Sequence, residues 1–393
     1  MAKRHGVGKS ARSAVARAQE VVLASSGTDA FELVLALAAA RVFPEAPVAK
    51  GERRAPTARE LRAFTARVRR AWPWLELPVG LDVPDDALLT TWGVLGDALA
   101  SSTASRGGAG EVLDAVFEEL VTKVGKGEKG QFFTPRHVVD LAVAALGLVD
   151  GERVVDPACG SGAFLTHARA RAKVTTWGCD VDARALRVAK LLAVASGERH
   201  ESRVRGDALE GTRTHAEAPW PSSIDAVLTN PPFAGEVKRP GFEVTRLVRR
   251  AERDAFFLER AVTFLKPGGR LAIVLPHGKV GAPVWAPLRR WLIERARVFA
   301  VVSLPRETFL PHTSQRTVLL VAKKRARGER AREGERVLFV ASERAGKDAA
   351  GDPIFRPGKE VAADAARERR VLDHDLADVQ ARLGKFLAAE GFR

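Results

Sequence analysis

The tetrapeptide Asn230-Pro231-Pro232-Phe233 has the composition of a site that reacts with a planar amino group. It follows the apolar run 224–229, which predicts a buried strand. An amino group conjugated to a ring is a poor nucleophile because its lone pair is delocalised, and acceptors placed around its N–H groups favour the reactive, pyramidal nitrogen. Asn230 and Pro231 supply carbonyl oxygens, the prolines restrict the backbone, and Phe233 offers a stacking face. The alternative is a proline-rich turn that only ends a strand.

A glycine turn precedes this tetrapeptide in the chain, where Asp156-Pro-Ala-Cys-Gly-Ser-Gly162 follows the apolar pair Val154-Val155. Glycines allow a ligand to approach the backbone closely, and the helix expected after them presents free N–H groups. A dinucleotide site requires a third glycine three residues after the second, and Leu165 occupies that position. The pattern therefore argues against a pyrophosphate ligand, although a single Gly-x-Gly is often just a tight turn.

Three aspartates follow three successive predicted strands, at 154–155, 175–179 and 202–205; they are Asp156, Asp180 and Asp207. Ligands of doubly wound sheets bind at the carboxyl ends of the strands, where an acid in the position of Asp180 accepts from ribose hydroxyls. Asp207 is suited to accept from an adenine amino group. One such acid is usually a helix cap or a loop residue. Three acids at one edge indicate a ligand site.

In this order the motifs resemble those of N6-adenine DNA methyltransferases, most closely the modification subunits of type I restriction systems. The resemblance extends from about Gly110 to Lys324, and the segment 130–136 (Gly-Gln-Phe-Phe-Thr-Pro-Arg) places it in the gamma arrangement of amino-methyltransferases. Further matching segments are 254–258, 265–270 and Leu304-Pro305 with Phe309. Cys159 fits a small-residue position, and Asp180 stands where the family more often has Glu.

The resemblance implies S-adenosylmethionine as the cofactor. The residues expected to bind it are Phe133, Thr134, Pro135, Asp156, Ala158, Gly160, Ser161, Gly162, Asp180, Asp207 and Asn230. Asn230, Pro231, Pro232 and Phe233 are the expected catalytic residues. A duplex adenine would rotate out of the stack, Phe233 would hold it, and the Asn230 and Pro231 carbonyls would polarise its amino group. The alternatives are a methyltransferase of RNA or of a protein glutamine, and a DNA-binding scaffold with a degenerate site.

The composition is consistent with a globular enzyme that binds a polyanion. The 393 residues carry a net charge of +15, which favours double-stranded DNA as a partner, although a GC-biased genome would also enrich arginine. No run of about 18 apolar residues predicts a membrane span. Two cysteines, both within the cofactor motifs, indicate a reducing, cytoplasmic location without a disulfide framework. No Cys/His cluster has the spacing of a metal site.

The elements that position these motifs suggest three parts. Residues 1–105 read as a helical domain, with a capping box at Thr57–Glu60 and an apolar helix at 31–40. Residues 106–341 read as a methyltransferase domain with a Rossmann-like doubly wound α/β sheet. Its seven expected strands are followed by an edge strand at 337–340, and the sixth and seventh, 299–304 and 317–322, should pair antiparallel. Residues 342–393 read as a helical tail.

We predict no target-recognition domain in this sequence, because the segment after Thr317 is too short to contain one. We therefore expect a separate specificity subunit to select the DNA site, with a restriction subunit as a second partner. The two ends of the chain are the expected docking elements, above all the segment after Val361.

Overall fold

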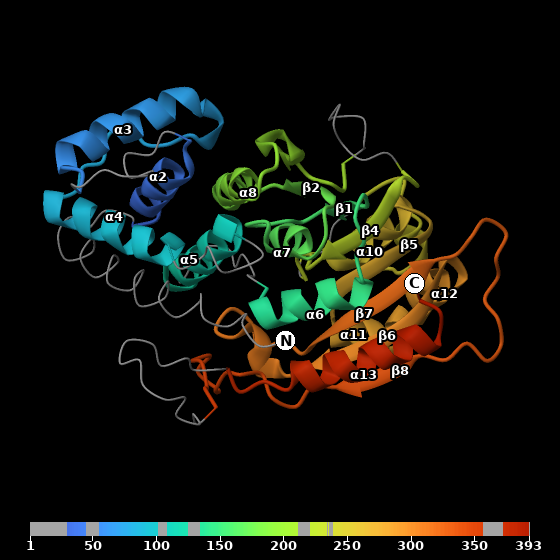
Figure 1. Ribbon diagram of the computed structural model, residues 1–393. Helices are drawn as coiled ribbons and strands as arrows, with labels where there is room; N and C mark the ends of the chain where they lie inside the picture. Colours follow the sequence, from blue (N-terminus) through green and yellow to red (C-terminus); the bar gives the residue numbers. More distant parts are fainter. Residues whose placement is uncertain are drawn as a thin grey trace. The chain divides into compact units, whose positions relative to one another are not determined.

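The computed structural model describes residues 30–44, 55–100, 108–124, 134–210, 221–233, 235, 239–356 and 372–392. They divide into two compact units (Figure 1). The first comprises the described residues within 1–129 and 187–201, and the second comprises those within 130–186, 202–362 and 370–393. No helix in the described ranges is both long and apolar enough to cross a membrane.

The first unit is helical, as predicted. Its elements are α2 (Ala30–Val42), α3 (Ala58–Ala71), η1 (Pro73–Leu75), α4 (Asp85–Ala100) and α5 (Gly108–Val124), together with the second half of α8 (Ala183–Ala195) and most of η3 (His200–Ser202). The capping box at the start of α3 is confirmed, since Glu60 N donates to Thr57 Oγ1 (3.3 Å) and Thr57 N donates to Glu60 Oε2 (2.7 Å). Helix α2 is buried on nearly every side, which explains its almost uniformly apolar sequence.

Helix α5 marks a difference from the expected boundary at residue 105. Its buried residues Val112, Val116 and Phe117 belong to the same apolar core as α2, and the Phe117 and Phe31 rings are 6.2 Å apart. Helix α5 consequently belongs to the first unit, although residue 105 was the expected end of the helical domain. The periodicity of α5 was visible in the sequence, but not the core in which its apolar face is buried.

The second unit is built on one eight-stranded sheet in the order β3-β2-β1-β4-β5-β7-β6-β8. The strands are β1 (Arg153–Asp156), β2 (Thr175–Asp180), β3 (Arg203–Arg205), β4 (Ile224–Thr229), β5 (Leu265–Pro276), β6 (Ala296–Leu304), β7 (Thr317–Lys324) and β8 (Leu338–Ala341). Strand β7 is antiparallel to both β5 and β6, and the remaining neighbours are parallel. The predicted doubly wound methyltransferase sheet and its antiparallel strand are thus confirmed.

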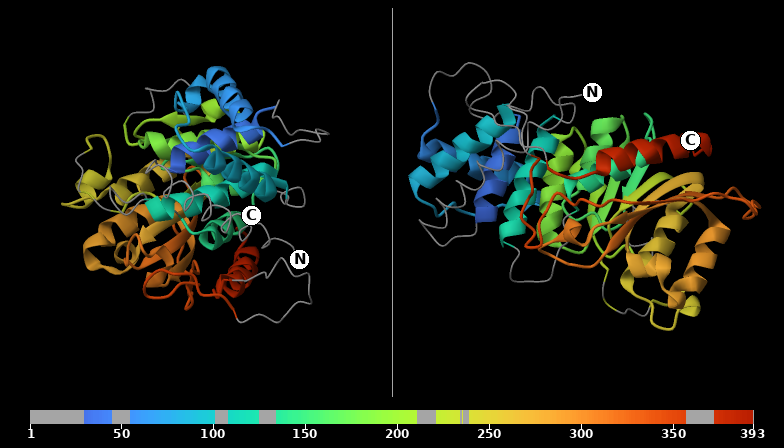
Figure 2. Two further views of the ribbon diagram at one scale, coloured as in Figure 1. Left: turned by 90° about the vertical axis from the view of Figure 1, so that its left-hand side faces the viewer. Right: turned by 90° about the horizontal axis from the view of Figure 1, so that it is seen from below.

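Helices cover both faces of this sheet (Figure 2). They are α6 (Arg136–Leu146), α7 (Ala163–Arg171), α9 (Val244–Leu247), α10 (Arg253–Phe264), α11 (His277–Gly281), α12 (Ala286–Arg295) and α13 (Leu376–Ala389), with short turns η4 (Pro283–Trp285) and η5 (Arg306–Phe309). Leu271, Ile273 and Leu275 of β5 join one apolar cluster with α10 and α12. Because side chains alternate along a strand, Ala272 and Val274 point to the opposite face. Both faces are buried, which is why β5 reads as a continuous apolar run.

The C-terminal segment corrects the expectation of a helical tail. Among its described residues only α13 is helical, while 342–356 are irregular and form isolated bridges such as Ala345 with His374. Helix α13 packs beside α6 (Figures 1 and 2), and the fully buried Phe392 ring lies 4.8 Å from that of Phe299. The end of the chain is therefore part of the core of the second unit.

We predict that Phe392→Ala lowers the free energy of unfolding of the second unit by about 3–5 kcal/mol, because it leaves a cavity beside β6. Phe339→Ala is the matched control, since Phe339 is 72% exposed on β8 and its truncation should change stability by no more than about 0.5 kcal/mol. Urea denaturation of both variants measures the difference. Equal effects would show that the C-terminus does not belong to the core.

Candidate functional site

The predicted site residues gather at one edge of the sheet. Asp156 ends β1, Asp180 ends β2 and Asn230 directly follows β4. These three strands run parallel, with Asp156 opposite Gly178 and Val155 opposite Val227. Parallel strands carry their carboxyl ends to the same edge, so residues far apart in sequence become neighbours there.

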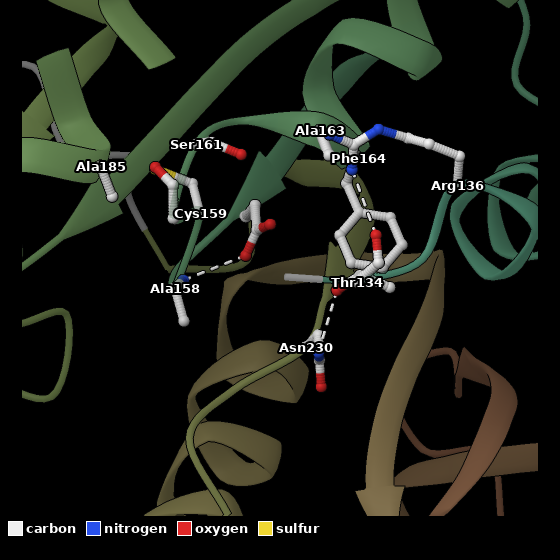
Figure 3. Close-up of a pocket in the computed structure, with 11 residues that line it drawn as sticks. Thr134, Arg136, Ala158, Cys159, Ser161, Ala163, Phe164, Ala185 and Asn230 are labelled. Carbon is white, nitrogen blue, oxygen red and sulfur yellow. Dashed lines mark hydrogen bonds between the residues drawn. The ribbon is translucent and has the colours of Figure 1, made fainter. Parts of the chain in front are cut away.

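A small hollow opens at this edge (Figure 3). Its lining residues are Thr134, Arg136, Asp156, Ala158, Cys159, Gly160, Ser161, Ala163, Phe164, Ala185 and Asn230. Six of the predicted residues are among them: Thr134, Asp156, Ala158, Gly160, Ser161 and Asn230. The segment upstream of β1, the glycine turn and the end of β4 therefore meet around one cavity.

The glycine turn has the geometry that its sequence suggests. Gly160 and Gly162 have φ angles of 50° and 85°, in the left-handed region that favours glycine. Gly160 N donates to Asp180 Oδ2 at 2.8 Å, so the acid at the end of β2 holds the turn in place. Gly160 lines the hollow, and a Cβ built on it would meet no protein atom within 4 Å.

Gly178, in β2, is a residue that the sequence reasoning missed. A Cβ there would lie 2.8 Å from Leu165 Cδ1 and 2.9 Å from Cys159 Sγ, closer than real Cβ atoms approach their neighbours. The glycine turn can pack over β2 only because this position lacks a side chain. Its position two residues before Asp180 was the available signal, but a glycine in a strand has many causes.

Two carboxyls, the buried Asp156 and the half-buried Asp180, face the turn. Asp156 is 1% exposed, and its Oδ1 accepts from Ala158 N at 3.0 Å. Burial raises the pKa of Asp156 to about 7, although the Ala158 hydrogen bond opposes the shift. Burial also raises the pKa of Asp180, against hydrogen bonds from the N–H groups of Asp182 and Gly160. A cationic ligand would favour the ionised form of both carboxyls.

Asn230 is anchored by one half of its amide. Its Nδ2 donates to Thr134 Oγ1 at 2.9 Å, which ties β4 to the segment before α6 (Figure 3). Its Oδ1 is buried and accepts no hydrogen bond from any described residue. Figure 3 shows this oxygen pointing away from Thr134. A buried acceptor without a donor is costly, so this atom is suited to a donor brought by a ligand.

Phe233 is less accessible than its predicted stacking role requires. The side chain is 4% exposed, and its ring meets the Phe309 ring edge-on at 6.2 Å. Lys347 fixes the backbone on both sides of Phe309, because its Nζ donates to Thr308 O (3.2 Å) and Leu310 O (2.7 Å). Stacking of a base on Phe233 would therefore require Phe309 to move.

The remaining predicted residues lie outside the lining of the hollow. Asp207 pairs with Arg239 and accepts from Leu209 N at 2.9 Å, so both of its carboxylate oxygens already have partners. Pro135 is the N-cap of α6, and Gly162 is the N-cap of α7. Asp180 accepts a hydrogen bond from the backbone of the glycine turn and does not line the hollow. The lining also excludes the three residues that follow Asn230, which are Pro231, Pro232 and Phe233. Phe133 lies outside the described residues.

Five lining residues were not predicted: Arg136, Cys159, Ala163, Phe164 and Ala185. Arg136 ends the quoted 130–136 segment, and Cys159, Ala163 and Phe164 adjoin the glycine turn, so the motifs gave their region but not their role. Ala185, in the first turn of α8, had no sequence signal. Burial raises the pKa of the Cys159 thiol well above its usual value, so this thiol stays protonated and is not a nucleophile.

Metal ligands are not grouped at this edge or elsewhere in the part of the chain that the structure describes. No set of three or more His, Cys, Asp or Glu side chains there is placed to hold a metal ion. The hollow instead offers the buried carboxyl of Asp156, glycine backbone and one amide oxygen.

Comparison with known proteins gives consistent matches. The model of the N-6 DNA Methylase family matches residues 108–357, more than half of the chain. The methylase subunit of the type I restriction enzyme EcoEI from Escherichia coli is 28% identical over 237 residues, which are 56% of this chain and 47% of that protein. The chain thus spans about half the length of this curated relative.

Solved structures share the fold. The methyltransferase subunit of a type I restriction-modification system from Streptococcus thermophilus superposes with a TM-score of 0.61 at 18% identity, covering 97% of this chain and 93% of that one. A Listeria monocytogenes protein assigned to the class I S-adenosylmethionine-dependent methyltransferases gives a TM-score of 0.57 at 16% identity, covering 85% and 92% of the two chains. At these identities the likeness establishes the fold alone.

Proposed function

This chain belongs to the N-6 DNA methylase family, and we propose that it transfers a methyl group from S-adenosylmethionine to N6 of adenine in duplex DNA. The observation that carries the proposal is the anchored amide of Asn230, whose buried oxygen has no donor among the described residues. It lines the same hollow as the glycine turn. An acceptor for an amino group is thus placed beside a site for a small ligand.

The hollow fits the cofactor on three observations. The space next to Gly160 is open. The carboxyls of Asp156 and Asp180 suit a cationic ligand. The backbone of the turn is held by Asp180, which does not line the hollow, so no side chain of the hollow is needed to hold it. Thr134, Asp156, Ala158, Gly160, Ser161 and Asn230 would hold the ligand, with Phe133, Pro135, Gly162, Asp180 and Asp207 as the further expected contacts. S-adenosylmethionine supplies an electrophilic methyl group on a sulfonium centre.

The chain's own residues then have two tasks. Asn230 Oδ1 and the Pro231 carbonyl accept from the amino group of an adenine rotated out of the duplex, which stabilises the charge that develops on its nitrogen. Pro231 and Pro232 restrict the backbone that carries these acceptors. Phe233 stacks on the base once Phe309 moves aside, and the ring fixes the orientation of the amino group. The proton that N6 loses after the transfer passes to solvent, so these tasks require no general base.

Gly160→Ala tests the cofactor site. The new Cβ meets no protein atom, and Gly160 lines the hollow, so we expect S-adenosylmethionine to bind at least tenfold more weakly in isothermal titration. Gly151→Ala is the matched control, because Gly151 also has a positive φ (87°) and open space but lies in the turn before β1, outside the lining. Both variants carry a similar backbone cost of about 1–2 kcal/mol. Unchanged affinity in Gly160→Ala would place the cofactor elsewhere.

Asn230→Ala tests the reaction itself. It removes an acceptor that strengthens in the transition state, so methyl transfer to adenine should fall by about 10²–10³-fold, far more than cofactor affinity falls. Thr134→Val keeps the Asn230 oxygen and removes only the anchor of Nδ2, so its loss should be smaller. Incorporation of labelled methyl groups into duplex DNA, RNA and glutamine peptides, assayed with the partner subunits present, measures both variants. Transfer to RNA or peptide but not to DNA would refute the proposed substrate.

The proposed partner is a specificity subunit that selects the DNA site, with a restriction subunit as the second partner. Its support is the EcoEI relative, which is a subunit of a type I restriction enzyme. The proposed docking element is the exposed face of α13, which carries Arg382 and Lys385. Deleting the whole C-terminal segment would be a poor test, because Leu383, Leu387 and Phe392 are buried in the core.

Reversal of surface charge tests docking without disturbing the core. We expect Arg382→Glu combined with Lys385→Glu to lose the specificity subunit in co-purification while cofactor binding persists. Arg330→Glu combined with Arg332→Glu, in the exposed loop between β7 and β8, lowers the net charge by the same amount and serves as the control. If the α13 variant retains the specificity subunit, the exposed face of α13 is not the docking site. If the isolated chain methylates one defined motif efficiently, no specificity subunit is needed to select the DNA site.

A further inference from the structure

We propose that Arg253, Arg306 and Arg316 bind the backbone phosphates of duplex DNA on either side of the target adenine. The three side chains are exposed and lie on two separate connections at the catalytic edge of the sheet. The inference rests on the proposed function and adds to it a phosphate-binding surface around the catalytic motif.

Arg253 is next to the loop that continues from the catalytic motif. Its backbone N donates to Gly235 O at 3.2 Å, and Gly235 comes five residues after Asn230. A Cβ built on Gly235 would lie 3.3 Å from Arg253 Nε. The arginine side chain therefore extends along the backbone of this loop, with its guanidinium exposed to solvent.

Arg306 and Arg316 bracket the segment that covers Phe233. Arg306 begins η5, whose last residue is Phe309, the ring that meets Phe233. Arg316 O accepts from His277 N at 2.9 Å, directly after the end of β5. Strands β6 and β7 pair Leu304 with Thr317, so both ends of this connection are fixed at the catalytic edge.

The charge of these arginines is not neutralised within the described part of the chain. None of the three forms an ion pair with a carboxylate there. Beside Arg253, Glu252 and Asp254 pair with Lys279. On the connection that carries Arg306 and Arg316 the one acid is Glu307, so two arginines stand against one carboxylate there. The edge therefore presents positive charge to whatever approaches the motif.

Phosphodiesters are the anions that this arrangement fits. The guanidinium fork binds phosphate oxygens through two parallel hydrogen bonds, and it stays charged at every relevant pH. A base that rotates out of a duplex turns about its own backbone, so the phosphates on both sides stay close to the entrance of its pocket. Contacts to them fix the position of the duplex and carry no sequence information directly.

A matched control exists at the opposite edge. Because β7 runs antiparallel to β5 and β6, the connection from β7 to β8 begins where the parallel strands start (Figure 1, orange loop at the right). It carries Arg327, Arg330 and Arg332, which are also exposed and form no ion pair within the described residues. Replacing them removes the same charge on the side away from the motif.

The experiment compares two triple variants of the full chain, Arg253→Gln/Arg306→Gln/Arg316→Gln and Arg327→Gln/Arg330→Gln/Arg332→Gln. Fluorescence anisotropy with a labelled duplex at several salt concentrations gives the slope of log Kd against log salt. Each phosphate contact adds about 0.9 to that slope, so the catalytic-edge triple should flatten it by about 2.7 and the control triple by much less. Cofactor titration and thermal melting should match the wild type in both variants.

Equal flattening by the two triples, or none by the catalytic-edge triple, would overturn the assignment of these arginines. Either result leaves the proposed function standing if the wild type still binds duplex DNA with a steep salt dependence. The absence of duplex binding by the wild type, alone and with its partner subunits, would instead count against the proposed function. The two failures are therefore distinguishable.

Discussion

Parallel pairing of β1 with β2 and with β4 is the constraint on which the site depends. It brings Asp156, Asp180 and Asn230 to one edge although they come from three separate segments. The glycine turn after β1 is then fixed from behind by the carboxyl at the end of β2, through the 2.8 Å hydrogen bond from Gly160 N. Gly178 leaves the room that this packing needs. A side chain at that one position would push the turn away from the sheet and distort the cavity.

Segments far from the recognisable motifs support the site as well. The ring of Phe233 rests against Phe309, and Lys347 holds the backbone carbonyls on both sides of Phe309. The irregular chain after β8 therefore helps to set the position of the catalytic aromatic ring. Helix α13 and Phe392 in turn complete the core beneath β6. The end of the chain thus contributes to stability, which separates its buried residues from any role in docking.

Charge is distributed unevenly in the second unit. Buried basic groups are paired, as Arg270 is with Glu152 and with the carbonyls of Leu146 and Gly147, because an unpaired buried charge is costly. Burial raises the pKa of Asp254, beside Lys279, to about 6, and that of Asp156 to about 7. Exposed arginines that pair with no acid in the described ranges lie at the catalytic edge. A polyanion would thus meet positive charge outside, and a small cationic ligand would meet the Asp156 carboxyl inside.

The sequence by itself determined the local features of this protein. The capping box of α3, the strands that precede Asp156 and Asn230, and the positive φ angles at Gly160 and Gly162 follow from short-range sterics and hydrogen bonding. The order of the motifs also predicted the doubly wound sheet with its antiparallel strand, because the proline-bearing connection between β6 and β7 is too short for a helical crossover. These features depend on neighbours along the chain.

Only the tertiary structure decided which side chains share a surface. In the folded chain α5 packs into the core of the helical unit, and the Phe233 ring is buried against Phe309. Asp207 forms an ion pair with Arg239, and Phe392 is a core residue. Each of these outcomes depends on a contact between residues distant in sequence, and one sequence records no such pairing. Composition and spacing specify what a segment can bury, but the partner that covers it is set by how the whole chain packs.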